Sequence, residues 1–265
     1  MWKRSVLLGL LLVAALSVRS ETIILIQGYQ AKGADWRSSG ITTSLAAAGW
    51  QDGGQITLSE APLEIPPGAR FFTVELTTDA QLLRQAEQLQ RHVGRVTAAR
   101  PGESLILVGH SAGGVLGRLF MVQHPKEPVT ALITFASPHL GTESAELGLA
   151  LSQSPLGWAS ALLGKEYDLL GRSEGLFFDL VRERPGSLLF WLNRQPHPPA
   201  RYISVVRDER LSWVGDLVVP VWSQDMNQVE QLRGRAISIA SSGNHSLERS
   251  DAELLLRILR RLRSS

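Results

Sequence analysis

The sequence predicts an α/β fold in which a mostly parallel central sheet is covered by helices on both faces. Short continuous apolar runs alternate with stretches of helical periodicity along most of the chain, which is the pattern of strand–helix–strand units. One of these runs enters a glycine-rich turn that leads directly into a helix. The chain has 265 residues, 44% of them hydrophobic and 20% charged, which is ample for one large core. We therefore expect one domain at residues 21–265.

Four elements are predicted before the glycine-rich turn. The continuous apolar run at residues 22–27 ends at Gly28 and is typical of a buried parallel strand. A helix is expected at residues 38–48, and a second strand at residues 70–76. A longer helix follows at residues 79–99, where apolar residues recur on one face.

Strands and helices continue to alternate after the turn. A strand is predicted at residues 129–136, and two more at residues 201–206 and 235–240. The last helix is expected to start near Ser250, because Ser250 and Glu253 have the spacing of a capping box.

Residues 104–117 carry the most informative pattern of the chain. An apolar run at residues 105–108 enters the turn Gly109-x-Ser111-x-Gly113, and a helix-competent apolar stretch follows it. This order is typical of a nucleophile elbow, in which a strained turn exposes a serine hydroxyl at the end of a sheet. Glycine is needed where so sharp a turn brings strand and helix backbones together. The helix N-terminus then directs its free N–H groups toward a developing oxyanion.

The same pattern occurs a second time at residues 171–175, which read Gly-Arg-Ser-Glu-Gly. No strand-like run precedes this copy, and Glu174 would place a negative charge beside a forming oxyanion. We therefore interpret Ser111 as the nucleophile and Ser173 as a turn residue.

A serine nucleophile needs a base within hydrogen-bonding reach, and the base needs a carboxylate to orient it. In open α/β sheets such groups lie on loops that follow the strands. His245 follows the predicted strand at residues 235–240, and it is the one histidine that fits the order Ser…Asp…His. His110 and His139 also lie near Ser111, but they precede or adjoin the wrong strands for a base.

Three aspartates compete for the third position, and their spacing does not choose between Asp208, Asp216 and Asp225. A loop aspartate by default forms a turn or caps a helix. Asp216 is favoured because Gly215 allows a tight turn there. Asp208 lies in a run of charged residues at 207–210, where solvent-exposed charge pairing is the simpler explanation.

Four stretches resemble the α/β-hydrolase superfamily, and within it the bacterial lipases and the GPI-inositol-deacylase-like serine esterases. They occur in the family order, as Gly-His-Ser-Ala-Gly-Gly at 109–114, Ser-Pro-His-Leu-Gly-Thr at 137–142, Gly-Asp-Leu-Val-Val-Pro at 215–220 and Asn-His-Ser-Leu at 244–247. The resemblance implies an α/β-hydrolase fold and a carboxylic-ester hydrolase that forms an acyl-enzyme. It also implies that Ser111, Asp216 and His245 form the catalytic triad.

The resemblance further implies an oxyanion hole made of the backbone N–H groups of Tyr29 and Ala112. The family's usual His-Gly after the first strand is here Gln27-Gly28, so a backbone donor is kept while the histidine is not. No organic cofactor and no catalytic metal are implied, although some relatives carry a structural calcium ion. The same triad would also serve an acyltransferase, and a non-catalytic binding protein on this fold is the remaining alternative.

Residues 142–200 interrupt the alternation, at the place where the resembling enzymes carry a lid or cap. The segment is helical in pattern, and its large apolar side chains suit a roof over an acyl chain. Ordinary core packing is the equally open alternative, because apolar stripes at helical spacing are usually core. The residues concerned are Trp158, Leu162, Leu163, Leu176, Phe177, Phe178, Leu188, Leu189, Phe190 and Trp191. A lipid or other ester with an apolar acyl group is the expected substrate, with transient contact to a lipid interface.

Residues 1–20 have the pattern of a secretory signal. Lys3 and Arg4 precede an apolar run at residues 6–15, and small residues follow. The run is short for a transmembrane span, so an uncleaved anchor is the less favoured alternative. The chain has no cysteine, which excludes disulfides and a lipid-modified N-terminal cysteine and suits bacterial export. A secreted or periplasmic location is therefore expected.

The net charge depends on this segment. Removal of Lys3, Arg4 and Arg19 leaves 24 basic against 25 acidic residues, so the net charge changes from +2 to −1. The basic isoelectric point of the whole chain consequently gives no reason to expect binding to nucleic acid.

Export predicts a mature chain that begins near Val18 or at Glu21, because cleavage is expected after a small residue at position 17 or 20. Mass spectrometry of the exported protein measures this terminus directly. Retention of Met1 in the exported protein would show an anchor instead of a cleaved signal.

Overall fold

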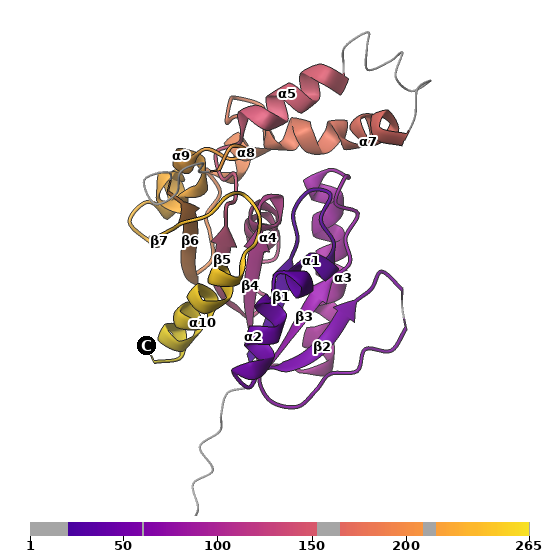
Figure 1. Ribbon diagram of the computed structural model, residues 1–265, viewed down its shortest axis with the longest axis vertical. Helices are drawn as coiled ribbons and strands as arrows, with labels where there is room; N and C mark the ends of the chain where they lie inside the picture. Colours follow the sequence, from indigo (N-terminus) through magenta and orange to yellow (C-terminus); the bar gives the residue numbers. More distant parts are fainter. Residues whose placement is uncertain (1–20, 60, 153–164, 209–215, 265) are drawn as a thin grey trace, which may run out of the picture.

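The computed structural model describes residues 21–59, 61–152, 165–208 and 216–264 (Figure 1). The expected signal at residues 1–20, the roof residues Trp158, Leu162 and Leu163, and Gly215 lie outside the described residues. Among the described helices, none combines the length and the apolar character needed to cross a membrane.

A seven-stranded sheet forms the centre of the molecule, with the strand order β2-β3-β1-β4-β5-β6-β7. All neighbouring strands pair in parallel. The strands are β1 (Glu21–Ile26), β2 (Gln51–Ile56), β3 (Arg70–Val74), β4 (Ser104–His110), β5 (Val129–Phe135), β6 (Arg201–Arg207) and β7 (Ala236–Ser241). Because the strands run in one direction, the loops after them all lie at one edge of the sheet.

Two hydrophobic clusters lie on opposite faces of the sheet. On one face α3 (Leu82–Ala99) and α4 (Ala112–Gln123) pack against alternate residues of the central strands, such as Ile24 and Leu107. On the other face α1 (Gly33–Ser38), α2 (Ile41–Ala47) and α10 (Arg249–Ser264) pack against the residues in between, such as Ile23 and Ile106. This two-faced arrangement confirms the predicted α/β fold class (Figure 1).

Strand β2 was not predicted, because its sequence Gln-Asp-Gly-Gly-Gln-Ile has no apolar run. It is an edge strand that pairs only with β3, and Ile56 is its one buried residue. Gly53 faces the ring of Phe72, where a Cβ would lie 2.1 Å from a ring carbon. Backbone pairing to β3 and this close contact therefore make the strand, which periodicity alone does not reveal.

The single helix predicted at residues 38–48 is two helices in the structure. Gly40 separates α1 from α2 with a φ of +82°, a left-handed conformation that glycine adopts without a steric penalty. The helix predicted from residue 79 begins at Leu82, and a distant residue binds its first N–H group. The Leu82 N–H donates to the Asp179 carboxylate at 2.7 Å.

Residues 142–200 include three described helices, α5 (Glu143–Ser152), α7 (Lys165–Leu180) and α8 (Leu188–Leu192). In Figure 1, α5 and α7 lie side by side above the carboxyl edge of the sheet. Asp179 at the end of α7 caps α3, and burial raises the pKa of its carboxyl group to about 6. The expected helical insertion therefore forms a layer of its own that is anchored to the domain below.

The apolar side chains of this insertion divide into two groups. Leu176 and Leu189 are buried in the same cluster as α3 and α4, so they serve as ordinary core. Phe178 and Trp191 are 47% and 43% exposed, which leaves them at the surface.

The last helix begins one residue earlier than predicted, and the expected capping box of Ser250 and Glu253 is wrong. The Asp251 carboxylate accepts a hydrogen bond from the Glu248 N–H at 2.8 Å. The residue that caps the helix N-terminus is therefore Glu248, two residues before the predicted Ser250. The same carboxylate pairs with Arg207 at 2.6 and 2.8 Å. Arg207 was expected among exposed charges at residues 207–210, but its side chain is fully buried against Asp251.

Replacing Arg207 by Met should lower the free energy of unfolding by about 3–5 kcal/mol, because the Asp251 carboxylate would stay buried without its partner. Urea denaturation measures this loss. Arg37→Met is the matched control, since Arg37 makes a similar two-bond contact to Asp52 with side chains that are 36% and 40% exposed. Loss of this exposed pair should cost at most about 1 kcal/mol. If both variants lose the same free energy of unfolding, burial does not make the Arg207–Asp251 pair more important for stability.

Candidate active site

Ser111 lies at the junction of β4 and α4 in a strained backbone conformation, with a φ of +52°. The glycines around it are required by close backbone contacts. A Cβ on Gly109 would lie 2.5 Å from the Cα of Gly114, and a Cβ on Gly113 would lie 2.5 Å from the carbonyl oxygen of Gln27. The turn therefore has the tight geometry expected at Gly109 and Gly113, and it leaves Ser111 at the carboxyl edge of the sheet.

The structure brings together Ser111, His245 and Asp216. The Nε2 atom of His245 lies 2.9 Å from Ser111 Oγ, and its Nδ1 atom lies 2.8 Å from Asp216 Oδ2. Ser111 follows β4, Asp216 lies on the connection after β6, and His245 lies between β7 and α10. Three segments that are far apart in the sequence thus meet in one hydrogen-bonded chain.

The contacts of Asp216 decide the proton positions in this chain. Its carboxylate is buried, and it accepts hydrogen bonds from the backbone N–H groups of Val218 and Val219 and from the Gln224 amide. An ionised carboxylate only accepts, so the His245 Nδ1 atom that faces it carries the proton. The Nε2 atom is then free to accept the Ser111 hydroxyl proton, which is the arrangement that a general base requires.

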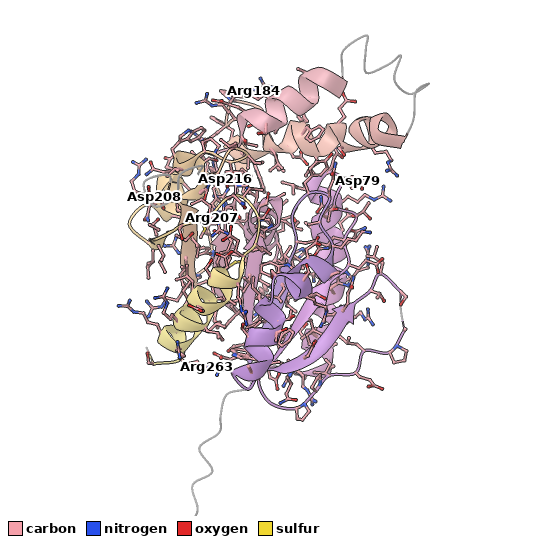
Figure 2. The ribbon with its side chains drawn as sticks, viewed as in Figure 1. Asp79, Arg184, Arg207, Asp208, Asp216 and Arg263 are labelled. Atoms are coloured by element: carbon pink, nitrogen blue, oxygen red, sulfur yellow. The ribbon has the colours of Figure 1, made fainter. Side chains whose placement is uncertain are left out.

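The two competing aspartates have other positions. Asp225 caps a short 3-10 helix, where its carboxylate accepts hydrogen bonds from Asn227 and from Ser238 of β7. Asp208 follows β6, where its N–H donates to the Ser241 carbonyl. In Figure 2 Asp208 lies at the outer side of the molecule and Asp216 lies nearer its centre. The carboxylate that meets His245 is therefore that of Asp216.

The loop after β1 passes directly against Ser111. A Cβ on Gly28 would lie 2.7 Å from the Cβ of Ser111, so no larger residue fits there. Tyr29 follows Gly28, and Ala112 is the first residue of α4. Their backbone N–H groups therefore belong to the two segments that border the serine hydroxyl, and their role as an oxyanion hole stays a prediction.

The interpretation of Ser173 as a turn residue is wrong. Ser173 lies inside α7 and is fully buried, and its hydroxyl accepts a hydrogen bond from the Tyr29 hydroxyl at 3.0 Å. The Tyr29 ring also packs edge-on against Phe177, with ring centroids 5.3 Å apart. Helix α7 thus contacts the loop beside Ser111, which the sequence did not indicate because the two segments are 144 residues apart.

A recess of about 560 Å³ lies beside the loop after β1. Its lining is mixed polar and apolar, and it comes from the carboxyl ends of β1, β2 and β3. The lining includes Gln27, Gln30, Lys32, Gln55, Glu75, Leu76, Thr77 and Asp79. As for metals, the described part of the chain contains no group of three or more His, Asp or Glu side chains that could hold an ion.

Comparisons with known proteins agree with the fold described above. Residues 17–146, which are 130 of the 265, match the family model of a PGAP1-like alpha/beta domain. The lipase BlEst2 of Bacillus licheniformis, in its mature form, superimposes with a TM-score of 0.57 at 14% identity, over 91% of this chain and 92% of that one. This chain has the α/β-hydrolase fold.

Two further solved structures superimpose over a similar share of this chain. A gene product of Listeria innocua has a TM-score of 0.57 at 14% identity, over 88% of this chain and 89% of that one. A putative cell surface hydrolase of Lactobacillus plantarum has a TM-score of 0.56 at 15% identity, over 91% and 90%. A sequence comparison with curated proteins finds no significant match. At these identities the comparisons confirm the predicted resemblance at the level of the fold.

Asp216→Asn should lower kcat by about 10⁴-fold while the α/β-hydrolase fold persists, because an amide cannot hold the His245 tautomer that the serine needs. Asp208→Asn is the matched control and should keep its activity. Rates on a soluble nitrophenyl ester and melting temperatures are measured together for both variants. If Asp208→Asn is the inactive variant and Asp216→Asn keeps its rate, the assignment of the acid is wrong.

Proposed function

We propose that this protein is a serine carboxylic-ester hydrolase of the lipase or esterase type. The observation that carries the proposal is the hydrogen-bonded chain from Ser111 through His245 to Asp216 at a strained turn. A general hydrolase function is also supported by the α/β-hydrolase-fold neighbours that are named as lipases and hydrolases.

The proposed reaction has two steps. Ser111 Oγ attacks the ester carbonyl while His245 Nε2 takes its proton, and the carbonyl oxygen becomes an oxyanion that accepts from the Tyr29 and Ala112 N–H groups. The C–O bond to the alcohol then breaks, and the alcohol leaves with the proton that His245 held. A water molecule next attacks the acyl-serine, with His245 again as the base, and it releases the acid and the free enzyme.

Asp216 supports both steps by stabilising the His245 imidazolium that forms in each of them. The chain itself thus supplies the nucleophile, the base, the carboxylate that orients the base, and the oxyanion donors. The proposed reaction accordingly uses no cofactor and no catalytic metal.

We further propose that the substrate carries an apolar acyl group and that residues 142–200 act as a lid or cap. This is supported by helix α7, whose Phe177 packs on Tyr29 beside the serine. The exposed Phe178 and Trp191 on the same insertion suit transient contact with a lipid interface. Secretion or periplasmic export is proposed from the signal pattern of residues 1–20.

Ser111→Ala should lower the esterase rate by several orders of magnitude and abolish labelling by a fluorophosphonate, because the nucleophile is lost. A series of nitrophenyl esters, both soluble and emulsified, should show faster turnover of octanoyl than of acetyl esters in the wild-type protein. Ser173→Ala is the control for the second copy of the pattern and should still be labelled. A fluorophosphonate found on Ser173 by peptide mapping would contradict the assignment, and preferred turnover of acetyl esters would contradict the apolar acyl group.

A further inference from the structure

The loop that carries His245 is held through two of its backbone carbonyl groups. The Nε2 atom of His110 lies 2.7 Å from the carbonyl oxygen of His245, and the two imidazole rings have centroids 5.2 Å apart. His110 is the last residue of β4 and immediately precedes Ser111. The base and the nucleophile are therefore both tied to the end of the same central strand.

A carbonyl oxygen only accepts, so the His110 Nε2 atom carries a proton and donates it to this bond. Burial lowers the pKa of His110 to about 4, and the neighbouring His245 and Arg207 act in the same direction. Asp251 is the acidic group that opposes them, and the bond to the His245 carbonyl opposes them too. His110 is consequently neutral at neutral pH, and it places no charge beside the imidazolium that His245 forms during the reaction.

The next carbonyl of the loop is held from a second strand. Arg207 at the end of β6 donates from Nη2 to the Ser246 carbonyl at 3.1 Å and from Nη1 to Ser241 Oγ at 3.0 Å. Its guanidinium is fixed in turn by the buried Asp251 carboxylate. Strands β4 and β6 thus restrain two successive carbonyls on the loop, while the His245 side chain itself is 21% exposed.

Such restraint matters for a proton transfer between Ser111 Oγ and His245 Nε2. A displacement of about 1 Å in a reacting group can cost on the order of 10²-fold in rate. The direct partners of the imidazole ring are Ser111 and Asp216, one bond on each nitrogen. These two bonds hold the imidazole ring itself. The backbone of His245 must be held by other groups.

We propose that His110 is a positioning residue that sets the distance between His245 and Ser111 by donating its Nε2 proton to the His245 carbonyl. It touches neither the ester nor the transferred proton. The inference rests on the proposed function, since it assigns His110 a part in the same reaction.

The test compares His110→Ala with His110→Gln, because the glutamine Nε2 occupies nearly the place of the imidazole Nε2 and keeps a neutral donor. His110→Ala should lower kcat by about 10- to 100-fold with little change in KM, because the ester still binds while the base is misplaced. The rate of fluorophosphonate labelling at Ser111 should fall in parallel. His110→Gln should recover most of both rates. All rates are measured on a soluble short-chain ester per titrated active site, so that unfolded protein does not count.

His92→Ala is the matched control. His92 is buried in α3, and its Nε2 atom lies 2.7 Å from the Glu75 carbonyl oxygen, so the same kind of bond is lost elsewhere in the fold. This variant should lose melting temperature and keep kcat.

The possible outcomes separate the two proposals. If His110→Ala lowers only the melting temperature and keeps kcat per site, His110 is merely structural and the inference is wrong. A His110→Gln variant that folds but stays as slow as the alanine variant would also overturn it. A wild-type protein that neither hydrolyses esters nor reacts with the fluorophosphonate would overturn the proposed function, and this inference with it.

Discussion

The structure around Ser111 depends on how closely helix α4 approaches strands β1 and β4. Positions 109 and 113 leave no room for a Cβ, and Gly28 on the neighbouring loop is equally confined. Ser111 is therefore held between packed backbones with a φ of +52°, a conformation that the local sequence would not adopt alone. The buried faces of β4 and α4 supply the apolar packing that sustains this strain.

The second copy of the glycine–serine pattern shows that this constraint lies in the packing and not in the residues. At Gly171 a Cβ would meet nothing within 4 Å among the described atoms, whereas at Gly109 it would meet helix backbone at 2.5 Å. Ser173 accordingly sits in a regular helix, and its buried hydroxyl binds Tyr29. The same five-residue pattern thus forms a strained turn in one place and, in the other, part of a helix that contacts the loop after β1.

The polar groups of the site are ordered by other polar groups at the same sheet edge. Asp216 is held by two backbone N–H groups and an amide, while Arg207 and Asp251 form an ion pair next to the His245 loop. Buried charges are tolerated only where such partners are present. Because these partners come from the end of β6 and from the segments that follow β6 and β7, which are neighbours in the sheet, the parallel order of strands brings them together.

The sequence by itself determined the fold class, the buried strands and the strand–turn–helix around Ser111, because apolar periodicity and glycine spacing are local properties. It also singled out His245 by its place after a predicted strand and Asp216 through the resemblance, although spacing alone left three aspartates open. Only the tertiary structure decided the edge strand β2, the cap that Asp179 places on α3, the burial of Arg207 and the contacts of Tyr29 and His110. Each of these joins residues that are distant in the chain, and their sequences carry no pattern that indicates the partner.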